Sequence, residues 1–138
     1  MNKLIQLISS LGFSKAGDIT LKSDQKPLFE LNARYSGFGL VYLWLEIGTD
    51  ESKIVYVGKA GKTLNERCGQ HVGGFNGGST TGTSHASRIC TGIENGKRYE
   101  LWSRKSDIIT LFGEKNISMA EVEEKAFIQK FQPIWNKF

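Results

Sequence analysis

The chain has little of what a disulfide-bonded, zinc-binding or membrane-spanning protein needs. Its 138 residues include two cysteines, Cys68 and Cys90, which lack the CxxC spacing of a zinc ribbon. Its longest apolar run, residues 40–45, is far too short to cross a bilayer. We therefore expect reduced thiols, no membrane partner and a cytoplasmic location.

Two other sequence features are also missing. The short apolar stretch 4–8 is not followed by a small-residue cleavage site, which favours a folded helix over a signal peptide. Residues 59–62, Lys-Ala-Gly-Lys, lack the GxxxxGK[ST] spacing of a phosphate-binding loop, so a nucleoside triphosphate ligand is poorly supported. Lys59 and Lys62 can still contact a nucleic-acid backbone.

Positive charge is concentrated in the middle of the chain. The net charge is +4, and residues 59–105 carry eight Lys or Arg against three Glu. A polyanion would bind there, and we predict that Lys59, Lys62 and Arg88 contact nucleic acid. Charge alone is equally compatible with a solvated basic face that binds nothing.

The first half of the chain predicts one helix and two strong strands. Apolar residues at helical spacing predict a helix over 3–11, ended by Gly12. A polar, turn-rich stretch, a short edge strand and a loop follow at 14–27, 28–31 and 35–39. Apolar runs then predict a central strand at 40–47 and a second strand at 53–58, joined by a hairpin turn.

The second half predicts helices around one more strand. A capping box, Thr63 to Glu66, opens a helix that should end near residue 72 at two glycines. The glycine-rich stretch 73–84 predicts a flexible loop. A short helix, a third strand and a final helix should follow, the last opened by a capping box at Ser118 and ended by Pro133; their expected ranges are 85–93, 99–103 and 118–131.

These elements predict a single α/β (α+β) domain. Its sheet should be small, three-stranded and antiparallel, flanked by helices, with an extra N-terminal helix. The length suffices for a core without disulfides. We divide the chain into an N-terminal helix with a polar extension, residues 1–37, and a core that spans residues 38–138.

One carboxylate interrupts the apolar stripe of the final helix. Glu124 falls in the middle of a stripe whose other members are Ala120, Phe127, Ile128 and Phe131. Glu121 and Glu123 should lie on the outer, water-facing side. A carboxylate that faces the core costs several kcal/mol to desolvate unless it is paired or binds a cation. A structural salt bridge to Arg67 is the alternative.

Arg67 and His71 lie four residues apart, so they share one helix face with Leu64. That face should turn toward the sheet and place polar groups where apolar ones are expected. Local violations of this kind need compensation and gather at functional sites. Tyr42 shares a strand face with Trp44, so its hydroxyl needs a partner, and a nearby cation could lower its pKa enough to take a proton from water.

These residues together resemble the GIY-YIG nucleases over roughly residues 38–137. The first motif resembles residues 40–42, Leu-Val-Tyr, with Leu40 where the family usually has glycine, and the second resembles residues 56–58, Tyr-Val-Gly. The rest of the family's ordered pattern is matched by Lys59-Ala60, Arg67, His71, Glu124, Phe127-Ile128, Phe131, Pro133 and Asn136. The departure at Leu40 raises a question about the tightness of the first turn.

The resemblance implies a three-stranded antiparallel sheet and a phosphodiesterase that uses one divalent cation, Mg²⁺ or Mn²⁺. By position, Glu124 would hold the metal, Tyr42 would help to deprotonate the attacking water, and Arg67 would stabilise transition-state charge. Tyr56 and His71 would support the site. Asn136 would bind nucleic acid or order groups near the site.

The residues themselves favour one metal over two. Two-metal nucleases bring several acidic ligands to a pair of cations, and only Glu124 is predicted to face inward here. A hard cation such as Mg²⁺ would complete its coordination with water and phosphate oxygens. Our first hypothesis is therefore a Mg²⁺-dependent DNA endonuclease, with restriction-like specificity as one version and double-stranded DNA as the expected substrate.

Three points stay open at this level. The chain could be a non-catalytic nucleic-acid-binding module of the same fold, or an RNase or nuclease toxin, because phosphate contacts do not separate DNA from RNA. Any sequence specificity would come from residues 73–87 or 13–38. The protein could act as a monomer or as a homodimer.

Overall fold

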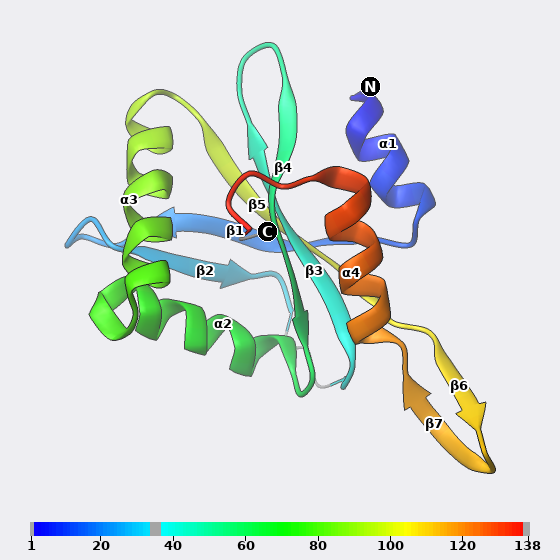
Figure 1. Cartoon of the computed structure of the whole chain (residues 1–138). Helices are drawn as coiled ribbons and strands as arrows, with labels where there is room; N and C mark the ends of the chain where they lie inside the picture. The colour runs from blue at the N-terminus through cyan, green and yellow to red at the C-terminus, as the bar shows by residue number, and fades with distance from the viewer. Residues whose placement is uncertain (1, 34–36, 137–138) are drawn as a thin grey trace.

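A five-stranded antiparallel sheet lies between two layers of helices in the computed structural model of the chain, which describes residues 2–33 and 37–136 (Figure 1). The strand order is β2-β1-β5-β3-β4, and a separate hairpin contains β6 and β7. The mixed fold and the antiparallel sheet agree with the sequence prediction, but three strands was too few. The strands are β1 (Ser14–Leu21), β2 (Pro27–Leu31), β3 (Leu40–Ile47), β4 (Ser52–Ala60), β5 (Arg98–Lys105), β6 (Ile108–Leu111) and β7 (Glu114–Ser118).

The helices divide between the two faces of the sheet. One face is covered by α2 (Leu64–Gly73), the π-helical turn η1 (Gly74–Gly78) and α3 (Thr80–Glu94). The other face is covered by α1 (Lys3–Ser10) and α4 (Ala120–Phe131). Among the described residues, no helix combines the length and the apolar character needed to span a membrane.

Strand β3 is apolar on both faces, as predicted for a covered central strand. Its even-numbered side chains, including Tyr42 and Trp44, face the α2 and α3 layer, while Val41 and Leu43 face α1 and α4. All four are at most 1% exposed. The alternation places the Tyr42 hydroxyl on the same side of the sheet as α2.

The prediction of a turn-rich stretch over residues 14–27 is wrong over most of that range. Strand β1 forms there and pairs with both β2 and β5. A Cβ at Gly17 would collide with the carbonyl oxygen of Glu30, so glycine permits the close pairing with β2. Ladder pairing on both sides stabilises a strand with few apolar residues. The short strand at 28–31 is confirmed as the edge strand β2.

The glycine-rich stretch 73–84 is not a flexible loop. It contains η1 and the first turn of α3, whose N-cap, Ser79, accepts a hydrogen bond from the Gly82 amide at 2.9 Å. A Cβ at Gly82 would collide with the backbone of Gly74. These glycines allow helical segments to pack closely. A glycine-rich composition is therefore shared by such segments and by flexible loops.

Two further differences lie near α4. The β6–β7 hairpin was not predicted and projects from the body beside the start of α4 (Figure 1). The predicted capping box of α4 is absent: Met119 is the N-cap and makes no side-chain cap bond, and Ser118 Oγ accepts from the Ala120 amide instead. By contrast, Thr63 caps α2 as predicted, accepting from the Glu66 amide at 3.2 Å. The predicted loop 35–39 lies partly outside the described residues.

Candidate active site

The predicted site residues meet at the outer edge of β4. This strand ends the sheet order, α2 follows it on one face, and α4 packs against it on the other. Arg67 comes from α2, Tyr56 from β4 and Glu124 from α4. Burial raises the pKa of both Tyr56 and Glu124 and the charge of Arg67 opposes that rise, so Arg67 lies within electrostatic range of both groups.

Tyr42 is buried and hydrogen-bonded to His71. Its hydroxyl lies 2.5 Å from Nε2 of His71, and the residue is 1% exposed. A Cβ at Gly58 would collide with the Tyr42 hydroxyl, which explains the need for glycine in the Tyr-Val-Gly motif. Burial raises the pKa of Tyr42 well above its ordinary value, and Arg67 only partly opposes this. The expectation of a lowered pKa is therefore wrong in its net direction.

His71 is a neutral partner for that hydroxyl. Burial lowers the pKa of His71 to about 3, and the nearby Arg67 and His85 add to the effect. The imidazole ring is in contact with the rings of Trp44 and Phe75, which fix its orientation. Leu64 and His71 turn toward the sheet, as predicted for this helix face, whereas Arg67 on the same face is only partly buried.

Tyr56 lies nearer the surface than Tyr42. It is partly buried, and its ring packs against Trp44 with centroids 4.5 Å apart. Burial raises the pKa of Tyr56; Arg67 opposes the shift, and the charge of Glu124 adds to it. Tyr56 is thus positioned between the buried Tyr42–His71 pair and the charged groups.

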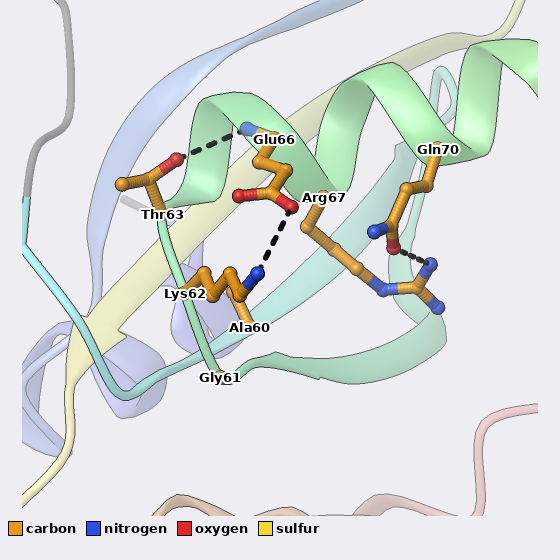
Figure 2. A pocket seen from close by; sticks show the side chains of 7 residues that line it. All are labelled: Ala60, Gly61, Lys62, Thr63, Glu66, Arg67 and Gln70. Carbon is orange, nitrogen blue, oxygen red and sulfur yellow. Dashed lines mark hydrogen bonds and ion pairs between the residues drawn. The ribbon is translucent and has the colours of Figure 1, made fainter.

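Arg67 lies in a hollow at the N-terminal end of α2 (Figure 2). Its Nη1 donates to Oε1 of Gln70 at 3.0 Å, and neighbouring Lys62 pairs with Glu66 at 4.0 Å. Sequence reasoning did not single out Gln70, although its position three residues after Arg67 on the same helix could have indicated it. The hollow has a volume of about 250 Å³ and is lined by Ala60, Gly61, Lys62, Thr63, Glu66, Arg67 and Gln70.

Glu124 is a half-buried carboxylate without a direct partner. Within residues 2–33 and 37–136, it makes no hydrogen bond and no ion pair within 4.0 Å. The salt bridge to Arg67, which was the alternative expectation, does not form. Burial raises the pKa of Glu124, while Lys59 and Arg67 oppose the shift and Glu121 adds to it. The carboxylate therefore lies within electrostatic range of Lys59 and Arg67 but, among the described residues, forms no ion pair with either.

Glu123 does not face water, contrary to the prediction. Its side chain is 13% exposed and pairs with Arg104, Oε1 to Nη1, at 2.5 Å. Its other oxygen accepts from the Asp107 amide at 2.9 Å. The helical stripe predicted Glu124 correctly as partly inward, but it could not anticipate a partner from β5 that lies beside the stripe.

The residues predicted to bind nucleic acid fall into two places. Lys62 lines the Arg67 hollow, and Lys59, at the end of β4, lies 3.9 Å from Glu121 of α4. Arg88 is exposed on α3 and lines a separate hollow with Asn136, one that includes neither Arg67 nor Glu124. The Asn136 amide accepts from the Val57 amide at 2.8 Å and donates to its carbonyl at 2.9 Å. This geometry supports the ordering role for Asn136.

The turn before β3 is tight despite the departure at Leu40. Gly39 takes a φ of +68°, and a Cβ there would lie 2.5 Å from Ser118 Oγ. Leu40 itself is 6% exposed and belongs to the core. The glycine that this tight turn requires is therefore Gly39, and Leu40 does not prevent the turn from forming.

Comparisons with known proteins bear on the fold and the family of the chain. No curated protein gives a significant match to the chain. A structure of a bacteriophage T4 EndoII mutant has a TM-score of 0.72 and 20% identity, and the alignment covers 96% of this chain and 98% of that one. The restriction endonuclease HPY188I in complex with product DNA has a TM-score of 0.51 and 14% identity, over 95% of this chain and 79% of that one.

At these identities the two structures show a shared fold. The sequence itself matches the GIY-YIG catalytic domain over residues 38–138, which is most of the chain. The prediction that the protein is an enzyme, an endonuclease of this type, is thereby confirmed. The chain belongs to the GIY-YIG family.

Proposed function

We propose that this protein hydrolyses phosphodiester bonds in DNA with one divalent cation, Mg²⁺ or Mn²⁺, and that Glu124 is the protein ligand of that cation. The observation that carries the proposal is the state of Glu124 itself. It is a half-buried carboxylate that faces Lys59 and Arg67 but has no hydrogen bond or ion pair in the described part of the chain. A buried carboxylate without a partner is costly, and a bound cation would offset that cost.

The donor set suits a hard cation that keeps most of its water. Among the described residues, no cluster of three or more His, Cys, Asp or Glu could hold a metal by itself. Mg²⁺ is often bound through one or two carboxylates together with substrate phosphates. When bound, such a cation would supply positive charge against the charge that develops on the phosphate.

Arg67 would act on the phosphate from the opposite side of β4. Its guanidinium lies in the hollow at the start of α2, where it bonds to Gln70 and interacts with the hydroxyls of Tyr42 and Tyr56. A guanidinium has five N–H donors, more than these contacts use. A guanidinium matches two phosphate oxygens at once, and donors already held in place lower the barrier more than donors that must reorganise. Lys59 and Lys62 would bind the neighbouring backbone.

Tyr42 and His71 would move the proton of the attacking water. Because burial raises the pKa of Tyr42, its phenolate is not available in advance. The hydroxyl can accept a proton only while it passes its own to the adjacent Nε2 of neutral His71, 2.5 Å away. Tyr56 is more exposed than Tyr42 and would orient the water. Asn136 would hold β4 in place through its two bonds to Val57.

DNA is the proposed substrate because the chain shares its fold with HPY188I, which was solved in complex with product DNA. The proposed contacts are to phosphate oxygens, which DNA and RNA share, so these contacts do not exclude RNA as the substrate. Matched DNA and RNA duplexes in one cleavage assay would separate the two substrates. Sequencing the cleaved ends would give any site preference and the spacing of the two cuts.

The test compares Glu124→Gln with Glu121→Gln, its neighbour on the same helix, whose side chain is 67% exposed. With supercoiled plasmid and Mg²⁺ or Mn²⁺, the wild-type protein should nick or linearise the DNA, and chelation should stop it. Glu124→Gln should lower the cleavage rate by about 10²-fold or more, as expected for loss of a transition-state interaction, and should still bind DNA. Glu121→Gln should stay within a few-fold of wild type. Wild-type rates from Glu124→Gln would remove the proposal.

A further inference from the structure

Glu123, the residue before Glu124, belongs to a hydrogen-bond network around Arg104 that joins four separate segments of the fold. Arg104 on β5 donates Nη1 to Glu123 at 2.5 Å, Nη2 to Asp107 at 3.2 Å and Nε to the Leu11 carbonyl at 2.8 Å. Glu123 in turn accepts from the Asp107 amide at 2.9 Å. This network, the Glu123–Arg104 clamp, connects the first turn of α4 to β5, to the base of the β6–β7 hairpin and to the end of α1.

The first turn of α4 has few other restraints. Its N-cap residue makes no side-chain cap bond. The Met119 amide donates to the Asp107 carbonyl at 2.9 Å, and the Ala120 amide donates to Ser118 Oγ at 3.2 Å. Both bonds fix the position of the backbone at the start of the helix. Among the described side chains of this turn, Glu121 pairs with Lys59 at 3.9 Å but is 67% exposed, whereas Glu123 is 13% exposed and held by the clamp.

We propose that Glu123 and Arg104 are positioning residues that set the direction in which Glu124 presents its carboxylate; this rests on the proposed function. Successive residues on a helix project about 100° apart. Holding Glu123 on the β5 side therefore fixes the rotation of the helix, and with it the direction in which the next residue, Glu124, projects. Outer partners of this kind orient metal ligands that have few protein contacts of their own.

A role in stability alone would not require these residues. Replacing a buried ion pair by packed apolar side chains is often neutral or stabilising, so the pair is weak evidence of stabilisation. Its position is informative because it lies one residue from the unpaired carboxylate. The chain contains a matched buried carboxylate, Glu46, which is 7% exposed and bonded by Tyr99 and Lys97 at the other end of β3.

The experiment titrates Mn²⁺ into wild-type protein and into Glu123→Gln, Arg104→Lys, Glu46→Gln and Glu124→Gln. The readout is paramagnetic broadening of backbone amide signals at residues 121–125, followed by NMR without DNA and paired with the Mn²⁺ dependence of cleavage. Arg104→Lys keeps the charge but cannot make the three bonds of the guanidinium, so it tests the clamp if Glu123→Gln does not fold. Thermal unfolding of each variant measures the accompanying loss of stability.

Both clamp variants should raise the Mn²⁺ midpoint about tenfold, in the range found for outer-shell changes, with a matching rise in the cleavage titration. Glu46→Gln should leave both midpoints within twofold even if it unfolds at a lower temperature. If the clamp variants shift the midpoints no more than Glu46→Gln does, the positioning role is wrong and the proposed function stands. If Glu124→Gln broadens like wild type, the cation assignment itself fails.

Discussion

Two glutamates at opposite ends of the β3–β4 pair differ in their hydrogen bonding and in the direction of their pKa shifts. Glu46 is nearly buried, accepts from the Tyr99 hydroxyl at 2.8 Å and from Lys97 at 3.1 Å, and lies 3.6 Å from Lys53. Burial disfavours its charge, but these hydrogen bonds and cations outweigh burial and lower the pKa of Glu46. At the other end, Glu124 is half-buried, lacks such bonds among the described residues, and has a raised pKa.

This contrast indicates that the two ends of the β3–β4 pair have different roles. A carboxylate whose hydrogen-bonding capacity is filled by its own protein contributes to folding and has nothing left for a ligand. A carboxylate held near cations but left unpaired costs stability in the free protein, which is the expected state of a group that awaits a cation. Glu46 therefore serves the fold, and Glu124 is the candidate for chemistry. The following variants test that division.

Removal of the guanidinium should have the largest effect. Arg67→Ala should lower the cleavage rate about 10²- to 10³-fold, because one preorganised donor to a transition state contributes about that much. Its thermal stability should fall only modestly, since Arg67 bonds to the exposed Gln70 and also interacts with the hydroxyls of Tyr42 and Tyr56. Single-turnover cleavage and thermal unfolding measure the two effects.

The matched control for this variant is Lys62→Ala. Lys62 lines the same hollow, and its side chain is 75% exposed. It should weaken DNA binding in a salt-dependent way with a small change in single-turnover rate at saturating protein. Equal rate losses from the two variants would mean that Arg67 contributes charge to binding and nothing particular to the transition state.

Glu46→Gln should show the reverse pattern, with a smaller free-energy change. It weakens charge-assisted hydrogen bonds from two partners, so the free energy of unfolding should fall by about 1.5 to 3 kcal/mol. Cleavage measured below the unfolding transition should match wild type. Chemical denaturation and a plasmid assay at the same temperature provide the measurements. A cleavage defect as large as that of Arg67→Ala would contradict the division between the two ends.

The site was largely predictable because its residues break local patterns. Glu124 interrupts an apolar helical stripe, and Arg67 and His71 break the inward face of another helix; the structure brings Arg67 and Glu124 to the two sides of β4. Such violations are visible in one dimension because the helical period is regular. The need of the buried Tyr42 hydroxyl for a partner was predicted, but not that the partner is His71 or that the net pKa shift of Tyr42 is upward.

What sequence reasoning missed depends on partners that are distant in the chain. Strand β1 is stabilised by pairing with β5, more than 80 residues later in the sequence, and its own side chains give a weak strand signal. Glycines at 74 and 82 permit close packing of helical segments, which composition cannot distinguish from a loop. Glu123 was assigned to water because Arg104 comes from another element. Each miss is a tertiary contact that overrides a local preference.

The pH dependence of stability should show the smallest effect and the clearest sign. Because the folded pKa of Glu124 is raised, the folded state binds its proton more tightly than the unfolded state does. The stability cost of its charge is present above the folded pKa and is relieved as pH falls toward the unfolded value of an ordinary glutamate. Glu46, with a lowered pKa, acts in the opposite sense, and its contribution is lost as pH falls through its folded value.

Metal-free wild type should therefore lose less stability on acidification than Glu124→Gln does, because the variant lacks the compensating gain. Thermal unfolding of the two proteins from neutral pH into the acid range, with a chelator present, measures the difference. Glu46→Gln should deviate from wild type in the other direction, with a shallower loss. If wild type and Glu124→Gln give parallel curves, the Glu124 carboxylate is not under strain in the free protein, and the contrast with Glu46 loses its physical basis.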